Sequence, residues 1–109
     1  MPEIWHTRDR AGSEVVLNSA CLNQILHSQA EMAGRLDEVH AAIAQLDFVA
    51  RAVRNHQQEI YYRRTPFRQA WIGVVANYQP VPQQGIWAGE VITVYRVKQP
   101  DPQEEPLSL

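Results

Sequence analysis

The sequence predicts an α+β fold in which one or two helices pack on a four-stranded antiparallel sheet, with a short N-terminal hairpin before them. A chain of 109 residues, 45% hydrophobic and 20% charged, is long enough for one domain with a single core. Apolar residues recur every three or four positions over residues 19–46, which is the spacing of an amphipathic helix. After Asp47 the chain changes to short runs of β-branched and aromatic residues, which are typical of strands.

The hairpin is predicted from two short extended pieces on either side of residues 9–12, whose Asp-Arg-Ala-Gly composition is typical of a turn. Asn18 or Ser19 then caps a helix, because a short polar side chain accepts hydrogen bonds from the free amides of a first turn. The apolar stripe continues to Leu46. Gly34 interrupts it, so two helices are favoured over one bent helix.

Four segments predict the strands of the sheet: residues 48–54, 59–64, 71–78 and 87–98. Short polar or proline-containing links join them, so we expect an antiparallel meander whose open face the helices cover. We assign residues 1–98 to a single domain. Residues 99–109 hold three prolines and three acidic residues, and this composition predicts a flexible tail.

The net charge of −2 conceals a separation of charge along the chain. Residues 1–50 have a balance of −4, residues 51–98 a balance of +5, and the tail a balance of −3. Nearly all basic residues are arginine, which binds phosphate and carboxylate groups through a planar fork of donors. The predicted sheet therefore favours an anionic partner. The acidic tail is interpreted as a solvated terminus, and the alternative hypothesis is that it folds across the basic sheet as a screen.

Composition also excludes several classes of protein. The longest apolar run is about six residues, against the roughly 18 of a membrane span, and no leader segment is visible. We therefore expect a cytoplasmic protein without a membrane partner. The single cysteine, Cys21, forms no disulfide within the chain. The four histidines are too scattered for a metal motif, and we predict neither a metal nor another cofactor.

Several pieces of the sequence share an order and spacing with a known superfamily: Trp5 with Arg8-Asp9 and Gly12, Leu36-Asp37-Glu38-Val39, Glu59-Ile60-Tyr61-Tyr62-Arg63, Val74-Val75, and Gly89-Glu90-Val91-Ile92-Thr93-Val94-Tyr95. This order resembles the small phage and bacterial proteins related to the barnase, EndoU, colicin and RelE ribonucleases, which share the BECR fold. The resemblance covers about residues 5–98. It implies metal-independent cleavage of RNA, in which the ribose 2′-hydroxyl attacks the neighbouring phosphate.

Such cleavage needs a base, an acid and fixed positive charge on the phosphate. The superfamily's His-Ile-x-x-x-His-Pro-Glu pattern corresponds to residues 24–31 here, with glutamine at both histidine positions. Glutamine orients a substrate but transfers no proton near neutral pH, so the neighbouring histidine is the candidate for proton transfer. The resemblance implies catalytic roles for His27, Arg51, Arg63 and Thr93, and substrate binding by Gln24, Gln29, Arg54, Tyr61, Tyr62 and Tyr95.

The simplest alternative for these residues is structural. His27 is then an ordinary helical histidine, and the sheet residues form cross-strand pairs on a solvated face. Successive strand residues point to opposite faces, so at most one of Arg63 and Arg64 joins a single site with Tyr61. The tryptophans, Trp71 among them, are interpreted as residues of the core or its margin.

Three functions remain open. The first is a ribonuclease or toxin-like protein that cleaves RNA, with a neutralising protein partner left open. The second is a protein of the same fold that has lost the chemistry and binds RNA, the ribosome or a protein partner. The third is an interaction module that forms a homodimer. We place RNA cleavage narrowly ahead, because the sheet half of the resemblance is intact.

Overall fold

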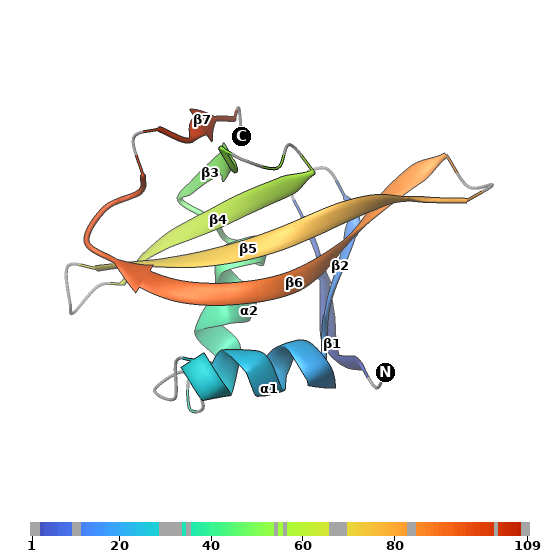
Figure 1. Cartoon of the computed structure of the whole chain (residues 1–109), viewed down its shortest axis with the longest axis horizontal. Helices are drawn as coiled ribbons and strands as arrows, with labels where there is room; N and C mark the ends of the chain where they lie inside the picture. Colours follow the sequence, from blue (N-terminus) through green and yellow to red (C-terminus); the bar gives the residue numbers. More distant parts are fainter. Residues whose placement is uncertain are drawn as a thin grey trace.

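A computed structural model describes residues 3–9, 12–28, 34, 36–53, 55, 57–65, 70–82, 85–101 and 103–107. Across these residues the chain forms two helices packed on one seven-stranded mixed sheet, in the order β1-β2-β6-β5-β4-β3-β7 (Figure 1). The elements are β1 (Glu3–Arg8), β2 (Glu14–Asn18), α1 (Ser19–Ser28), α2 (Leu36–Ala44), β3 (Phe48–Arg51), β4 (Gln58–Thr65), β5 (Ala70–Val81), β6 (Ile86–Val97) and β7 (Glu105–Pro106). Neither of these helices is long and apolar enough to cross a membrane.

The predicted N-terminal hairpin is confirmed, since β1 pairs antiparallel with β2. At its turn the Gly12 amide donates to the Asp9 carbonyl at 3.0 Å, and the Ser13 amide donates to the Asp9 carboxylate at 2.9 Å. Gly12 has a φ of 83°, a conformation that favours glycine. Val15 and Leu17 of β2 are both fully buried, so this alternation decides which face of the hairpin joins the core.

The prediction of a four-stranded antiparallel sheet is wrong, although its four strands are present as β3, β4, β5 and β6. The hairpin extends the sheet because Val15 and Val16 pair in parallel with Gly89 and Glu90 of β6. At the opposite edge β7 pairs antiparallel with β3. Both additions join segments that are far apart in the sequence, and local periodicity carries no signal for such pairing.

The predicted helical region divides into two helices, as the interruption at Gly34 favours. The Asn18 side chain caps α1, because its Oδ1 accepts a hydrogen bond from the Cys21 amide at 2.9 Å. From α1 the core receives Ile25, and from α2 it receives Val39 and other buried residues. Both helices cover the same face of the sheet (Figure 1), which we call the inner face.

Alternation along the strands divides the buried side chains between the inner face and the opposite, outer face. The inner cluster includes Tyr61, Ile72 and Val74 together with the helix residues. A separate cluster on the outer face includes Tyr62 and Val75. Neighbouring tyrosines of β4 therefore lie on opposite sides of the sheet, as a strand period of two requires.

Within the described part of the predicted tail, residues 99–101 and 103–107, the contacts with the sheet come from residues 104–107. Beyond the short pairing of β7 with β3, the Leu107 amide donates a hydrogen bond of 3.0 Å to the Val49 carbonyl. The Leu107 side chain packs against the inner cluster. The acidic segment thus contacts the strands whose basic charge complements it.

Candidate nucleic-acid interface

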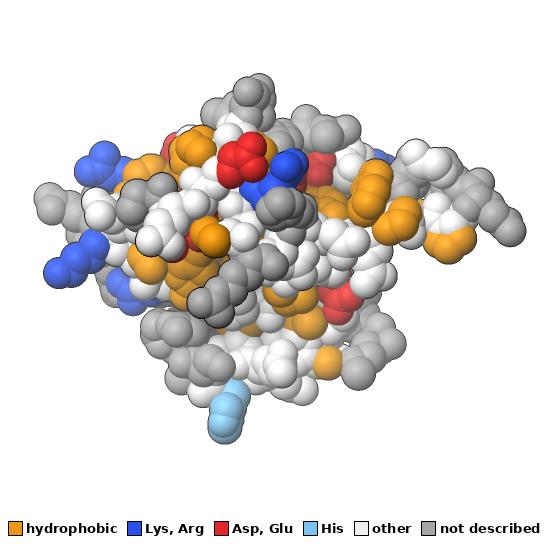
Figure 2. Space-filling view, turned by 45° about the horizontal axis from the view of Figure 1, so that its top comes forward, with side chains coloured by type: hydrophobic (Ala, Val, Ile, Leu, Met, Phe, Trp, Pro, Cys, Tyr) orange, Lys and Arg blue, Asp and Glu red, His pale blue; other side chains and the backbone are white. Residues whose placement is uncertain are grey.

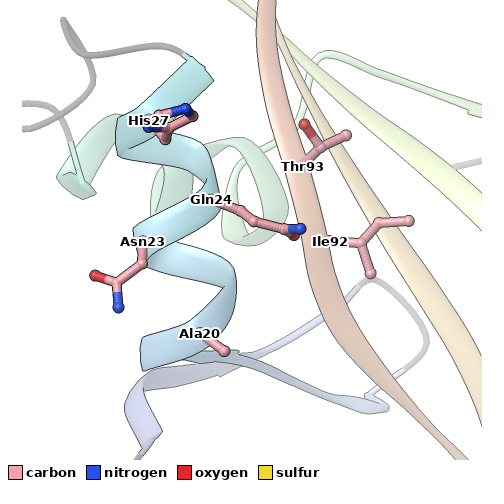
Figure 3. A pocket seen from close by; sticks show the side chains of 6 residues that line it. All are labelled: Ala20, Asn23, Gln24, His27, Ile92 and Thr93. Carbon is pink, nitrogen blue, oxygen red and sulfur yellow. The ribbon is translucent and has the colours of Figure 1, made fainter.

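An open groove of about 620 Å³ lies between α1 and the second half of β6. Its lining residues are Ala20, Asn23, Gln24, His27, Ile92 and Thr93. Gln24 points from α1 toward β6, whereas Asn23 points away from the strand (Figure 3). The helix side of the groove therefore presents an amide and an imidazole, whereas Ile92 and Thr93 project from the side of β6 that faces away from α1 (Figure 3).

Glu90 ties the start of α1 to β6 and so positions the helical wall of the groove. Its Oε1 accepts hydrogen bonds from Asn18 Nδ2 at 2.6 Å and from the Cys21 thiol at 3.4 Å. Burial, followed by the Glu90 carboxylate, raises the pKa of the Cys21 thiol, so it is not an activated nucleophile. One turn later Ile25 is buried in the core, which leaves His27 exposed at the groove.

Four aromatic side chains on the outer face form what we call the aromatic cluster: Phe48, Tyr62, Trp71 and Tyr95. Tyr62 is central, with its ring centroid 5.9 Å from that of Phe48. The centroids of Trp71 and Tyr95 each lie 6.4 Å from it in edge-on contacts. Tyr62 is fully buried, whereas the other three rings are partly exposed and present aromatic surface to a ligand.

A glycine makes room for one ring of the aromatic cluster. Gly73 of β5 pairs with Tyr95 of β6. A Cβ atom at Gly73 would lie 2.9 Å from two ring carbons of Tyr95 and 3.1 Å from a ring carbon of Tyr62. The ring of Tyr95 therefore lies over bare backbone, and the absence of a side chain at Gly73 determines how closely the rings approach the sheet.

Basic side chains lie at the end of the sheet where β4 and β6 finish and β5 begins; this basic end comprises Arg63, Arg64, Arg96 and Lys98. Figure 2 shows Lys and Arg side chains gathered at one end of the visible face. Arg64 lies two residues after Tyr62 and therefore on the same face. It is exposed and pairs across the strands with Trp71, so positive charge adjoins the aromatic cluster.

Tyr61 belongs to a separate hydrogen-bond network on the inner face. Its hydroxyl lies 2.6 Å from that of Tyr78 and donates to the Glu59 carboxylate at 2.7 Å. The Tyr78 hydroxyl donates to Asp9 at 2.7 Å. Burial is the largest cause that raises the pKa of both tyrosines, so both stay neutral phenols. This network joins the hairpin turn to β4 and β5, on the side of the sheet opposite the aromatic cluster.

The tail places the carboxylate of Glu104 next to the aromatic cluster. The Tyr62 hydroxyl donates to Glu104 Oε1 at 2.6 Å and lies 2.9 Å from the Tyr95 hydroxyl. Glu104 is only 9% exposed, and burial is the main cause that raises the pKa of its carboxyl group. The next residue, Glu105, forms an ion pair of 3.8 Å with Arg51.

The structure brings several of the predicted site residues into two neighbouring places. They are Gln24, His27 and Thr93 in the groove, and Tyr62 and Tyr95 in the aromatic cluster. Thr93 connects the two places, because it pairs with the outer-face residue Val75 and lies two residues before Tyr95 on β6. Thr93 therefore lies at the border between the groove, whose helical wall belongs to the inner face, and the aromatic cluster of the outer face.

The other predicted site residues do not join these two places. Arg63 lies on the side of the inner face and donates to the Gln45 carbonyl at 2.9 Å and to Gln45 Oε1 at 3.2 Å. Arg51 lies on β3, three strands from β6 in the sheet order. Neither arginine lines the groove. Gln29 and Arg54 lie outside the described residues.

Sequence reasoning did not select Phe48, Trp71, Arg64 or Lys98 as site residues. Alternation along β4 is the signal that finds Arg64, because it places this residue on the face of Tyr62. Selecting Trp71 as a site residue requires the register between β4 and β5, because this register sets Trp71 beside Arg64. Phe48 joins the same cluster only through the pairing of β3 with β4.

The groove, the aromatic cluster and the basic end define an α+β protein with a polar, aromatic and cationic surface on one mixed sheet. In the part of the chain that the structure describes, no three His, Cys, Asp or Glu side chains are grouped to hold a metal ion. No known protein family, no curated protein and no solved structure matches this chain.

Proposed function

We propose that the protein binds single-stranded RNA across the outer face of its sheet. The observation that carries the proposal is the aromatic cluster beside Arg64, because bases stack on aromatic rings while basic side chains contact phosphates. The cross-strand pairing of Arg64 with Trp71 allows one nucleotide to place its base on a ring and its phosphate on a guanidinium. The balance of +5 over residues 51–98 favours the same polyanionic ligand.

The groove beside α1 supports base recognition at the border of this surface. An unpaired base exposes its hydrogen-bonding edges, and an amide such as that of Gln24 offers both a donor and an acceptor to them. His27 and Thr93 add further polar groups. Thr93 and Tyr95 are two residues apart on β6, or about 7 Å along a strand, so one RNA strand can contact both places.

The geometry favours binding over the cleavage that the resemblance to BECR-fold ribonucleases implies. Cleavage needs a base, an acid and positive charge around one phosphate. Of the described groove residues, His27 is the one of a type that commonly serves as a general acid or base. Arg51 and Arg63 have their contacts elsewhere. RNA cleavage is the second candidate, because His27 and Thr93 line the same groove.

Fluorescence anisotropy with a labelled pyrimidine-rich RNA tests the binding proposal. Trp71→Leu keeps an apolar side chain but removes a stacking ring, and we expect it to weaken binding by about 1–3 kcal/mol. Trp87→Leu is the matched control, because Trp87 is 49% exposed and pairs with Pro80 near the opposite end of the β5–β6 hairpin. Equal losses in the two variants, or no binding by the unmodified chain at low salt, would contradict the proposal.

Incubation of the same RNA with the protein in EDTA tests the second candidate. Metal-independent attack by the 2′-hydroxyl leaves RNA fragments with 2′,3′-cyclic phosphate ends. These shorter fragments separate from intact RNA on a gel. We expect bound RNA to remain uncut, in both the unmodified chain and His27→Gln. If the unmodified chain produces fragments with cyclic ends and His27→Gln produces none, the protein cleaves RNA and His27 takes part.

A further inference from the structure

The acidic tail covers part of the surface to which we assign RNA binding. From the end of β6 the chain reaches β3, on the far side of β5 and β4 in the sheet, and so passes two strands (Figure 1). On the way Glu104 contacts Tyr62 on the outer face. Tyr62 is fully buried with the tail in this position. The tail therefore contacts the central residue of the aromatic cluster through its hydroxyl group.

Two phenol hydroxyls, those of Tyr95 and Tyr62, form a chain of hydrogen bonds that ends at the Glu104 carboxylate. The Tyr62 hydroxyl carries one proton and donates it to Glu104. The contact of 2.9 Å between Tyr62 and Tyr95 must then be donated by Tyr95. Each phenol thus directs its proton toward the tail. This is a position for any anionic oxygen, and a phosphate oxygen accepts such a hydrogen bond as a carboxylate oxygen does.

Among the described residues, the tail is held by the hydrogen bond from Tyr62 to Glu104, by the contacts of Leu107 and by two weaker interactions. Strand β7 has two residues, and the ion pair between Arg51 and Glu105 is long, with side chains 38% and 66% exposed. An exposed ion pair of this kind contributes little to stability. Burial of the Glu104 carboxylate opposes docking, because the charge loses hydration. Leu107 supplies the main apolar contact, so a ligand with stronger contacts is able to displace the segment.

We propose that the tail is a built-in competitor of RNA: Glu104 occupies the position of a phosphate oxygen at Tyr62, and RNA binds there when residues 103–107 leave. This inference rests on the RNA-binding function proposed above. Because tail and RNA exclude each other, undocking the tail increases the fraction of chains that are able to bind. By reciprocity, RNA binding releases the tail.

A substitution that undocks the tail without changing charge tests the proposal in the full chain. Leu107→Ser weakens the apolar contact, and the Kd for labelled single-stranded RNA is expected to fall about fivefold, the effect of a tail that is docked in about four of five molecules. Val53→Ser alters an exposed apolar residue and is the matched control, with an unchanged Kd. If Leu107→Ser also leaves the Kd unchanged, the competitor role is overturned while RNA binding stands.

NMR of the unmodified chain provides a measurement that needs no variant. The Leu107 amide, hydrogen-bonded to the Val49 carbonyl, reports on the docked tail. Added RNA is expected to move the amide signals of residues 103–107 to positions of unstructured chain. RNA that binds without moving these signals overturns the competitor role alone. If neither the unmodified chain nor Leu107→Ser binds RNA at low salt, the RNA-binding function fails, and the competitor role fails with it.

Discussion

The hydroxyl of Tyr62 donates a hydrogen bond of 2.6 Å to the carboxylate of Glu104, a residue 42 positions later in the chain. This contact joins the acidic C-terminal segment to the centre of the aromatic cluster on the outer face. It involves a tyrosine that is fully buried and a carboxylate that is 9% exposed. The same contact therefore determines the state of the tail and the accessibility of the proposed RNA surface.

Tyr62→Phe is expected to loosen the tail while the aromatic cluster stays packed. The substitution removes the donor to a buried carboxylate, and a loss of this kind costs about 1–3 kcal/mol. Hydrogen exchange of the Leu107 amide measures the docking free energy. Tyr95→Phe is the matched control, because the Tyr62 donor to Glu104 remains in place. If Tyr95→Phe lowers the docking free energy as much as Tyr62→Phe does, the hydrogen bond from Tyr62 to Glu104 is not the contact that holds the tail.

Acidification is expected to strengthen the docking of the tail. Burial raises the pKa of the Glu104 carboxyl above its ordinary value of 4.5; the Tyr62 hydrogen bond opposes this shift and the Asp101 charge adds to it. The docked state thus binds more protons than the undocked state in the window above pH 4.5, so docking is lost as pH rises through that window. Protection of the Leu107 amide, corrected for intrinsic exchange, should be greater at about pH 5 than at about pH 7.5.

Glu104→Gln is the control for this pH dependence. The amide carries no charge and accepts the hydrogen bond from Tyr62, so docking should become nearly independent of pH over the same window. The other charged contact of the docked segment, between Arg51 and Glu105, is present in both forms. An unchanged pH profile in Glu104→Gln would assign the effect to a group other than Glu104.

Local sequence signals predicted the elements of this fold better than their pairing. The Asp9–Gly12 turn, the Asn18 cap and the four strands of the meander depend on neighbouring residues, and the structure has all of them. The parallel pairing of Val15 with Gly89 depends on segments far apart in the chain, and periodicity carries no signal for it. The extension of the sheet from four strands to seven was missed for this reason.

The sequence predicted only part of the candidate surface, because the surface also depends on pairing between segments that are far apart in the chain. Alternation separates Tyr61 from Tyr62, and this follows from the sequence alone. The neighbours of Tyr62 come from three other strands and from the tail, so the register had to be known before Trp71 or Glu104 could be assigned to it. The acidic, proline-rich composition of the tail predicts mobility and contains no sign of a buried anchor such as Glu104.

Gly73→Ala is expected to disturb the aromatic cluster and to weaken RNA binding. The new Cβ atom would lie 2.9 Å from the ring of Tyr95, closer than van der Waals contact, so the rings of Tyr95 and Tyr62 must shift. Overpacking of this kind costs about 1–3 kcal/mol of stability. Gly34→Ala is the matched control, because a Cβ there meets no atom within 4 Å. Urea unfolding measures the stability, and equal effects of the two substitutions would contradict the packing role of Gly73.

Arg64→Gln is expected to reduce the salt dependence of RNA binding without abolishing it. Arg64 is exposed and pairs across the strands with Trp71, so its guanidinium group is near enough to contact the phosphate of a stacked nucleotide. Each phosphate contact with a single strand contributes about 0.7 to the slope of log Kd against log salt concentration, and the substitution should lower the slope by about this amount. Arg8→Gln is the matched control, because β1 is the strand at the opposite edge of the sheet from β7, and its slope should not change. Equal reductions in both variants would mean that RNA responds to the net charge of the chain, and the basic end would lose its assigned role.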